Sequence, residues 1–465
     1  MNDHAALSNA FRLRPEPTPR IETRHRRIQT DLPAPATCEL VRESSDLFAE
    51  VNCYQPPILW DRAEGYQVFD AVGNAWIDFS STAVMTNSGH GHPAVREAIR
   101  VHSEDGLLAQ FSFASEVRVS LARELLKLAP PSCEKVYFWT VGSEAIECAL
   151  RLTREYGARK RPGKLQILTH SGDYHGWTHG AHQLSGISAQ KEWMPGSDSG
   201  IHHLPFPRTE SGPPPTDAEW RAFFDDNIAQ LEARGVRPED VAAVFIETLQ
   251  GWGALDLPKA YVQRLREWAD AHEVLLVFDE VQTGFGRTGR WFGHEHYDVR
   301  ADLLCIGKGL TSSLPLAAVL GPAAVLDAVP PGAITTTHAA HPLSCAAALA
   351  NLKVLREERL VEMSDSSGRI ARREMGKLRE RFPGLIAEVR GLGLLNAFHV
   401  KNGSTGEPDR RLARDWTWAA VKHGVMVFQT NQTTLKVCPP LVIPEDALIE
   451  GIAALGDALE SLGHR

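Results

Sequence analysis

Two residues with catalytic chemistry follow neighbouring apolar segments of the chain. Asp279 comes directly after the run 274–278, and Lys308 follows the run 303–306 with a glycine on each side. Both runs are typical of buried strands. Because α/β enzymes gather functional side chains where strands end, we expect Asp279 and Lys308 to share one edge of a sheet. A single lysine is ordinarily a solvated surface residue, but a desolvated lysine forms Schiff bases near neutral pH.

A candidate phosphate site lies at Gly142 and Ser143, after a strand expected at 136–139. We expect Ser143 to cap the helix that follows, and Gly142 to let the backbone approach a ligand closely. Free N–H groups and the helix dipole attract phosphate at such an end, although every capped helix shares these features. Pyridoxal phosphate needs a lysine, a phosphate site and a carboxylate for its ring nitrogen, and the chain offers all three.

Three other sites suggested by short motifs are rejected. The run 284–289 has the letters of a GxGxxG dinucleotide fingerprint, but no amphipathic helix follows it, so we predict a turn and no nicotinamide cofactor. The run 307–309 fails as a phosphate loop because Gly309 stands where Ser or Thr would bind magnesium. Two histidine pairs lack the spacing or the third ligand of a metal site, so no metal is expected: His90 with His92, and His294 with His296.

The composition is that of an ordinary soluble enzyme. Of 465 residues, 43% are hydrophobic and 23% are charged, and the net charge of −9 gives no electrostatic reason to expect nucleic acid or a membrane as partner. Seven cysteines without CxxC spacing favour a reducing, cytoplasmic compartment over a disulfide framework. No apolar run approaches the roughly 20 residues that span a bilayer.

The hydrophobic pattern predicts a large α/β domain at 94–340. Apolar strands alternate there with amphipathic helices, which is typical of a mostly parallel sheet wrapped by helices. A β-hairpin is expected at 68–79, within a segment 41–93 that contributes to a smaller α+β domain formed mainly by 341–465. Residues 1–40 are rich in arginine and proline and are expected to form a poorly ordered, solvated extension.

The stretch from Asp279 to Gly289, followed by Lys308, resembles the class III (ornithine/4-aminobutyrate-type) pyridoxal-phosphate aminotransferases. The resemblance covers roughly residues 50–460 in collinear order. Supporting matches are 87–93, 142–145, 174–176, 247–251, 337–345 and 390–394. It implies a fold-type I transferase that binds pyridoxal phosphate, with an amine or amino acid as donor and a keto acid or aldehyde as acceptor. It also implies a homodimer in which both subunits build each site.

The resemblance assigns the central roles to two residues. Lys308 would form the internal aldimine and, once released by the substrate amine, would carry the proton between Cα and C4′ on the way to the pyridoxamine form. Asp279 would pair with the ring nitrogen and keep it protonated. Seven further residues would contact the cofactor: Gly142, Ser143 and the partner subunit's Thr337 at the phosphate, Tyr174 and Val281 on the two ring faces, Gln282 near the phenolic oxygen, and Glu247 on the same side.

Departures from the family pattern concern the substrate. Trp252 stands where many relatives have a glutamate that masks the substrate-carboxylate arginine, here Arg390, and Tyr54 matches a family position near the substrate. Ala83 falls where ornithine aminotransferases carry a tyrosine. We therefore expect a preference for a bulky or apolar amine, an amino sugar or a nucleoside. A racemase, epimerase or aminomutase of the same fold is the alternative, and a non-catalytic binding protein on this fold is a remote one.

Overall fold

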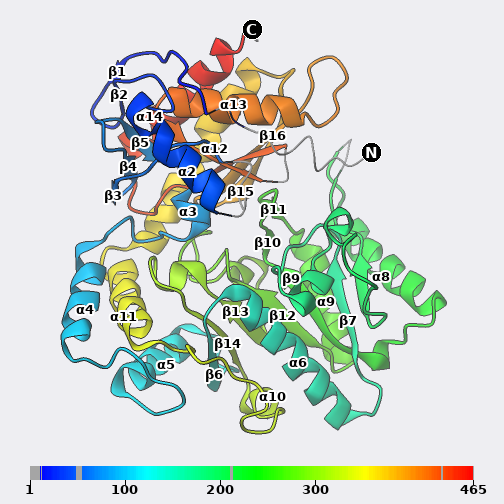
Figure 1. Ribbon diagram of the computed structural model, residues 1–465. Helices are drawn as coiled ribbons and strands as arrows, with labels where there is room; N and C mark the ends of the chain where they lie inside the picture. Colours follow the sequence, from blue (N-terminus) through cyan, green and yellow to red (C-terminus); the bar gives the residue numbers. More distant parts are fainter. Residues whose placement is uncertain (1–10, 12, 49–54, 210–212, 431–432, 464–465) are drawn as a thin grey trace. The chain divides into compact units, whose positions relative to one another are not determined.

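Figure 1 shows the computed structural model, which describes residues 11, 13–48, 55–209, 213–430 and 433–463. The chain divides into two compact units. One comprises 1–92 together with 360–465, and the other comprises 93–359. The expected boundary at 340 differs from this division because helix α11 (Pro342–Glu357) packs on α4 (Pro93–Glu104) and α5 (Glu116–Leu128), and so belongs to the unit 93–359.

The unit 93–359 is built on a seven-stranded sheet of order β6-β14-β13-β12-β9-β7-β8. Strand β14 is antiparallel to both of its neighbours and the other pairs are parallel, so the predicted α/β fold with a mostly parallel sheet is confirmed. The strands are β6 (Lys135–Trp139), β7 (Gln166–His170), β8 (Ile201–Leu204), β9 (Val241–Glu247), β12 (Leu275–Asp279), β13 (Leu303–Ile306) and β14 (Ala317–Gly321), and β10 (Leu249–Gln250) pairs separately with β11 (Leu255–Asp256).

The strand register aligns the residues with catalytic chemistry. Asp279 ends β12 and lies beside Glu247, the last residue of β9, and beside Cys305 of β13. Lys308 lies three residues after Cys305 in the sequence. Because these three strands are parallel, their carboxyl ends meet at one edge of the sheet, as expected for Asp279 and Lys308.

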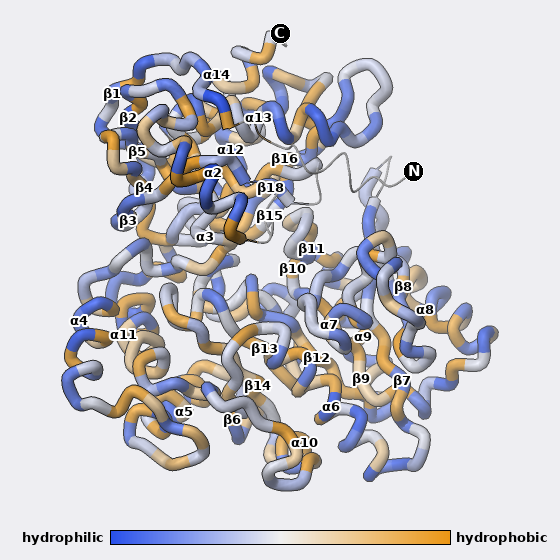
Figure 2. The backbone as a smooth tube through the Cα atoms, in the orientation of Figure 1, coloured by the Kyte–Doolittle hydropathy of each residue, from blue (hydrophilic) through white to orange (hydrophobic). Residues whose placement is uncertain are grey.

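Helix α6 (Gly142–Lys160) leads from this sheet edge across the sheet. Its buried face places Ile146, Ala149 and Leu152 in one hydrophobic cluster with Val277 and Leu303. The remaining helices of the unit are α7 (His179–Leu184), α8 (Asp217–Ala233), α9 (Lys259–Ala271) and α10 (Ala323–Leu326). Figure 2 shows hydrophobic residues along β7 and β9, and alternating hydrophilic and hydrophobic residues along α8, as expected for a buried strand pair and a half-exposed helix.

The start of α6 differs from the expected Ser143 cap. The cap position is occupied by Val141, and the Glu144 carboxylate reaches back to accept hydrogen bonds from the N–H groups of Thr140 (2.9 Å) and Val141 (3.3 Å). Glutamate at the third helical position commonly satisfies N-terminal N–H groups in this way. The Ser143 hydroxyl is thereby left for another role, and it accepts a hydrogen bond from the N–H of Trp177 (3.3 Å).

The other unit contains two sheets. One has the order β1-β2-β5-β4-β3 with β17 beside β5, and it includes the predicted hairpin as β4 (Gln67–Phe69) and β5 (Ala75–Asp78). Its other strands are β1 (Ile21–Glu22), β2 (Arg27–Ile28), β3 (Arg62–Glu64) and β17 (Val425–Met426). The second sheet is β15 (Ile386–Leu392), β16 (Leu395–Val400), β19 (Thr434–Val437) and β18 (Phe428–Thr430), and the helices are α2 (Cys38–Leu47), α3 (Ser81–Val84), α12 (Leu360–Arg381), α13 (Arg410–Lys422) and α14 (Glu445–Ser461).

The arginine-rich segment before residue 40 is folded from residue 13 onward, unlike the extension we expected. Arg26 forms a 2.8 Å ion pair with Glu450 of α14, and Glu16 accepts hydrogen bonds from Trp418 and Lys422 of α13. These partners lie about four hundred positions away in the chain, so local sequence could not reveal them. Residues 1–10 and 12, which belong to the predicted extension, lie outside the described residues.

In the described part of the chain, no helix is long and apolar enough to cross a membrane.

Candidate active site

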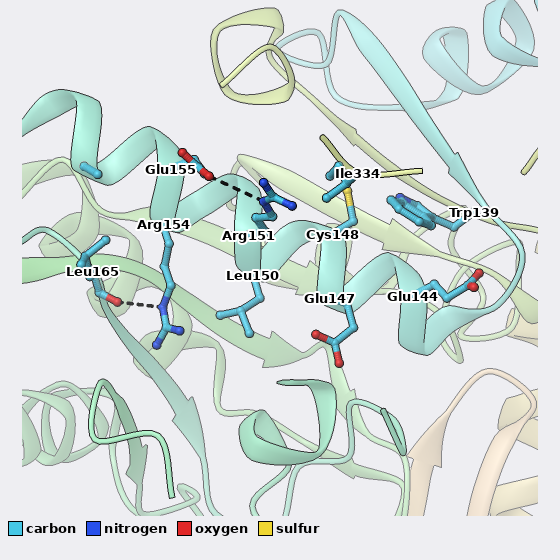
Figure 3. A pocket seen from close by; sticks show the side chains of 11 residues that line it. Trp139, Glu144, Glu147, Cys148, Leu150, Arg151, Arg154, Glu155, Leu165 and Ile334 are labelled. Carbon is cyan, nitrogen blue, oxygen red and sulfur yellow. Dashed lines mark hydrogen bonds and ion pairs between the residues drawn. The ribbon is translucent and has the colours of Figure 1, made fainter. Parts of the chain in front are cut away.

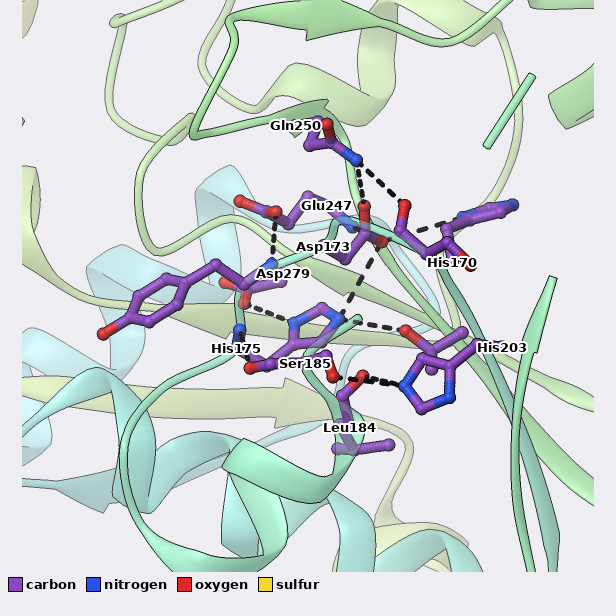
Figure 4. A network of polar contacts seen from close by, with 12 residues as sticks. His170, Asp173, His175, Leu184, Ser185, His203, Glu247, Gln250 and Asp279 are labelled. Atoms are coloured by element: carbon purple, nitrogen blue, oxygen red, sulfur yellow. Dashed lines mark hydrogen bonds and ion pairs between the residues drawn. The ribbon is translucent and has the colours of Figure 1, made fainter. Parts of the chain in front are cut away.

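Three buried carboxylates meet at the edge of the large sheet (Figure 4). Glu247 and Asp279 end adjacent strands, and Asp173 lies in the loop that follows β7. Each is less than a tenth exposed. Burying several carboxylates together costs free energy unless hydrogen bonds, cations or protons compensate them, so this edge is a concentrated electrostatic site.

His175 bridges two of these acids. Its Nδ1 lies 2.9 Å from Oδ2 of Asp279, while its Nε2 lies 3.3 Å from the hydroxyl of Thr169 and 3.9 Å from Oδ2 of Asp173. Burial lowers the pKa of His175, but the hydrogen bond to Asp279 and the charges of Asp173 and Glu247 outweigh it, so the pKa is raised. The imidazole is therefore biased toward its cationic form.

Glu247 favours its neutral form. Burial and the nearby charge of Asp173 raise the pKa of Glu247 to about 8. Its carboxyl oxygens accept hydrogen bonds from the N–H groups of Tyr174 (2.7 Å) and Gly251 (2.9 Å). These bonds tie the loops after β7 and β9 together around the sheet edge.

Lys308 is held in an unusual backbone conformation. Its φ of 41° lies in the left-handed region, which a residue other than glycine adopts only when the surroundings enforce it. Burial lowers the pKa of Lys308, partly offset by the charges of Asp279 and Glu247. Among the described residues its side chain makes no hydrogen bond or ion pair. A lysine with a lowered pKa and an uncommitted amine is suited to attack a carbonyl.

Close backbone approaches form a cradle beside the lysine. A Cβ on Gly142 would lie 2.8 Å from Cγ1 of Val281, and one on Gly176 would lie 2.2 Å from the hydroxyl oxygen of Ser143. Neither glycine can therefore be replaced without displacing its neighbour. The start of α6, the loop around Tyr174 and the segment after Asp279 meet at this point, where the N–H groups of α6 favour an anion.

An aromatic wall adjoins the cradle. The ring of Tyr174 contacts Trp252 edge-on with 5.4 Å between centroids, and it contacts Trp177 with 5.6 Å. Gln282 lies against the loop of Gly251, because a Cβ on that glycine would come within 2.7 Å of the Gln282 amide nitrogen. The predicted residues Tyr174, Trp252 and Gln282 thus lie with Glu247 at the same sheet edge.

Three predicted residues are not placed with this group. Arg390 belongs to the unit formed by 1–92 and 360–465, where its guanidinium bonds Glu388 at 2.9 Å. Tyr54 lies outside the described residues. Thr337 is exposed in the segment before α11, and within the described chain it makes no hydrogen bond to Gly142 or Ser143.

Asp173 and His175 were not predicted as members of the site, although residues 174–176 carry one of the family matches. Their positions in the sequence could have indicated them, since both come shortly after the apolar strand 166–170 and Asp279 likewise stands at the end of its strand.

No group of three or more histidine, cysteine, aspartate or glutamate residues in the described ranges could hold a metal ion. His90 instead bonds Asp78 at 2.7 Å.

A separate cavity of about 560 Å³ runs along α6 (Figure 3). Its lining includes Trp139, Cys148 and Arg151, and it contains neither Lys308 nor any of the three buried carboxylates. The convergent polar groups at the sheet edge are the better indication of an active site.

The run 284–289 is a turn, as predicted, and Glu280 organises it. The buried carboxylate of Glu280 accepts hydrogen bonds from the N–H groups of Gly293 (2.8 Å) and His294 (2.7 Å) and from the hydroxyl of Thr283. Burial raises the pKa of Glu280, but the His294 contact and these hydrogen bonds outweigh it and hold the pKa below its usual value. The segment after Asp279 is fixed by this residue.

Replacing Glu280 by Gln should destabilise the protein by about 2 kcal/mol or more at pH 7, because charged hydrogen bonds are lost in a buried place. Since the folded-state pKa is lowered, the contribution is complete above the unfolded pKa of about 4.5 and is lost as the pH falls further. Urea unfolding at several pH values measures this difference. The exposed Glu239→Gln change is the control and should have almost no effect. Equal stability of the two variants would contradict this role of Glu280.

Comparison with known proteins identifies the family. The sequence profile of "Aminotransferase class-III" matches residues 48–459. A probable 4-aminobutyrate aminotransferase of Bacillus subtilis is 34% identical over 411 residues, covering 86% of this chain and 92% of that protein. A leucine/methionine racemase of Thermococcus litoralis is 30% identical over 428 residues, covering 90% and 95%.

Solved structures agree with this assignment. A thermostable (S)-enantioselective omega-transaminase from Thermomicrobium roseum has a TM-score of 0.83 at 31% identity, covering 90% of this chain and 98% of that one. An amine transaminase from an uncultivated Pseudomonas species, described in its pyridoxal-phosphate-bound form, has a TM-score of 0.80 at 29% identity, covering 87% and 94%. The chain therefore belongs to the class III aminotransferase family of pyridoxal-phosphate-dependent enzymes.

Proposed function

We propose that pyridoxal phosphate binds beside Asp279 and Lys308, and that Lys308 is the residue to which its aldehyde attaches. The observation that carries the proposal is the lysine itself. It is partly buried, its pKa is lowered by burial, and its amine has no polar partner among the described residues although buried carboxylates lie nearby. The reaction is transfer of an amino group from an amine or amino acid to a keto acid or aldehyde.

The residues at the sheet edge suit this cofactor. The carboxylate of Asp279 provides the counter-ion that a protonated pyridine nitrogen requires. The start of α6 offers backbone N–H groups and the Ser143 hydroxyl to a phosphate, and the tight contact between Gly142 and Val281 permits close approach. Tyr174 and Val281 are proposed to cover the two ring faces, with Gln282 and Glu247 on the phenolic side.

The chain's own groups then control protons. When bound, pyridoxal phosphate supplies an aldehyde that takes up the amino group and a ring that withdraws electrons. Asp279 favours the protonated state of the ring nitrogen because a nearby carboxylate stabilises a cation. Lys308 would move the proton of the substrate's Cα, because burial lowers its pKa and so favours the neutral amine that can accept a proton. His175 holds the Asp279 carboxylate in position from the other side.

The aromatic wall supports a bulky or apolar amine as donor. Trp252 and Tyr174 contact each other edge-on and offer apolar surface in place of the carboxylate that many relatives carry at position 252. A hydrophobic pocket selects larger apolar groups by roughly 1–3 kcal/mol per methylene. Arg390 is proposed to bind a substrate carboxylate, and Tyr54 is proposed to lie near the substrate.

We propose a homodimer in which Thr337 of the partner subunit completes the phosphate site. Support comes from the unit 93–359, which exposes large apolar side chains next to the proposed site. Trp177 is 56% exposed although its N–H bonds Ser143, and Val141 is 48% exposed at the start of α6. Exposed apolar surface of this kind commonly marks an interface.

The six cysteines within the described residues are free and buried, which favours a cytoplasmic location.

Racemisation is the second candidate reaction. The 30% identical leucine/methionine racemase and a 32% identical isoleucine 2-epimerase of Lentilactobacillus buchneri support it. Both reactions begin by removing the proton from the same carbon. Formation of a keto product in proportion to consumed amine favours transamination, whereas loss of optical rotation without keto acid favours racemisation.

Replacement of Lys308 by Ala should abolish turnover, with kcat lowered about 10³-fold or more, because the general base and the attachment point are removed together. Stopped-flow absorbance at the bound cofactor's visible band, with amine added in excess, measures the first half-reaction directly. Lys191→Ala is the matched control, since burial also lowers the pKa of that lysine although it lies outside the proposed site. Full activity of Lys308→Ala would refute the assignment.

Replacement of Trp252 by Ala should lower kcat/KM for bulky apolar amines about tenfold or more, while small donors change little. Trp252→Glu should lower it further by placing a charge in the pocket. A kinetic panel of arylalkylamines, ornithine and 4-aminobutyrate measures the profile, with Trp220→Ala on α8 as control. If ornithine or 4-aminobutyrate is the best donor of the unmodified enzyme by orders of magnitude, the proposed substrate class is wrong.

A further inference from the structure

We infer that Asp173 is a positioning residue that supplies the counter-charge for His175, so that the Asp279 carboxylate remains free to pair with a cation on its other side. The inference rests on the proposed function, because that cation is the cofactor's ring nitrogen. The contact between Asp173 and His175 is a feature of this chain's own fold, however, and can be measured without cofactor.

The geometry places His175 between two acids on opposite sides of its ring (Figure 4). Nδ1 faces Asp279 at 2.9 Å and Nε2 faces Asp173 at 3.9 Å, and the imidazole is fully buried. The backbone N–H of His175 bonds the Ser185 hydroxyl at 2.9 Å, and Phe245 packs against the ring edge-on. The imidazole therefore cannot turn toward solvent, and its charge must be balanced where it lies.

Asp173 is itself held in place by neutral groups. Its Oδ1 accepts from the Gln250 amide at 3.1 Å, and its Oδ2 accepts a long bond from the N–H of Glu247 at 3.4 Å. Within the described chain, no lysine or arginine forms an ion pair with it. Its ion-pair contacts there are the two histidines, His170 at 3.7 Å and His175 at 3.9 Å. A fully buried carboxylate without a guanidinium or ammonium partner makes a nearby imidazolium favourable.

Asp173 adds a second acidic group to the one that Asp279 presents to His175. Glu247 favours its neutral form and His175 favours its cationic form. Because Asp173 faces Nε2 while Asp279 faces Nδ1, the imidazolium does not depend on Asp279 alone for its counter-charge. Asp279 can then also pair with a further cation, the protonated ring nitrogen, which would be costly in a buried place without a counter-charge.

Other groups around His175 do not provide this counter-charge. On β7, Thr169 offers a neutral hydroxyl, and on β9 the Glu247 carboxyl favours its neutral form. On β8, His203 bonds the carbonyl oxygens of Leu184 and Ser185, and burial lowers its pKa so that it favours the neutral form. The two aspartates are therefore the charges that face the His175 ring.

The test compares Asp173→Asn with Thr169→Val in cofactor-free protein. Histidines labelled with ¹³C at Cε1 report the pKa of His175 by NMR, with the resonance assigned from its absence in His175→Gln. Asp173→Asn should lower the pKa of His175 by about one unit or more, because a buried opposite charge is removed. Thr169→Val removes a neutral hydrogen bond at the same ring nitrogen and should change the pKa much less. An unchanged pKa in Asp173→Asn, or equal decreases in both variants, would overturn the inference.

A second measurement applies even if Asp173→Asn is poorly stable. In His175→Gln the Asp173 carboxylate has lost the His175 imidazolium, so adding Asp173→Asn should raise the thermal unfolding midpoint above that of His175→Gln alone. A lower midpoint of the double variant would show that Asp173 acts only as a structural hydrogen-bond acceptor.

The holoenzyme completes the test. Asp173→Asn should weaken pyridoxal phosphate binding about tenfold and move the pH midpoint of the bound cofactor's visible absorbance, whereas Thr169→Val should do neither. Binding and midpoint that match the unmodified enzyme would overturn the inference. If the unmodified protein binds no cofactor while the His175 pKa still falls in Asp173→Asn, the charge relation stands and the proposed function fails.

Discussion

The arrangement of the candidate active site depends on one electrostatic constraint, which is the burial of three carboxylates at or just after the ends of neighbouring strands. Glu247 and Asp279 are adjacent because β9 and β12 pair in parallel register, and Asp173 joins them from the loop after β7. Carboxylates cannot be buried together in their charged form without compensation. Glu247 responds by favouring its neutral form, and His175 responds by favouring its cationic form.

The same constraint explains what surrounds these acids. Lys308 also lies near these acids, and burial lowers its pKa although the charges of Asp279 and Glu247 oppose this. The strained φ of Lys308 and the tight glycine contacts at Gly142 and Gly176 are tolerated because strong packing over-determines the local structure. Glu280, next to Asp279 in sequence, has a structural task instead and fixes the turn that follows. Two neighbouring acids thus serve different purposes because their hydrogen-bond partners differ.

Much of this frame could be predicted from the sequence because it depends on local patterns. The ends of apolar strands placed Asp279 and Lys308 together, and the absence of a helical pattern after 284–289 excluded a dinucleotide loop. The Asp279–His175 contact could not be predicted in this way, because it joins residues 104 positions apart. The Arg26–Glu450 pair, which orders the arginine-rich segment, spans 424 positions. The Ser143 cap was wrong because the helix begins at Gly142, so Val141 holds the cap position and Ser143 lies inside the first turn.

We propose that Lys308 is the residue that carries pyridoxal phosphate at the sheet edge where Asp173, Glu247 and Asp279 are buried. Reduction of the holoenzyme with sodium borohydride converts a lysine-bound cofactor into a stable secondary amine, and proteolysis with mass spectrometry locates the modified residue. We expect a pyridoxyl group on the peptide containing Lys308 and on no other lysine. A pyridoxyl group on a different lysine, with Lys308 unmodified, would contradict it.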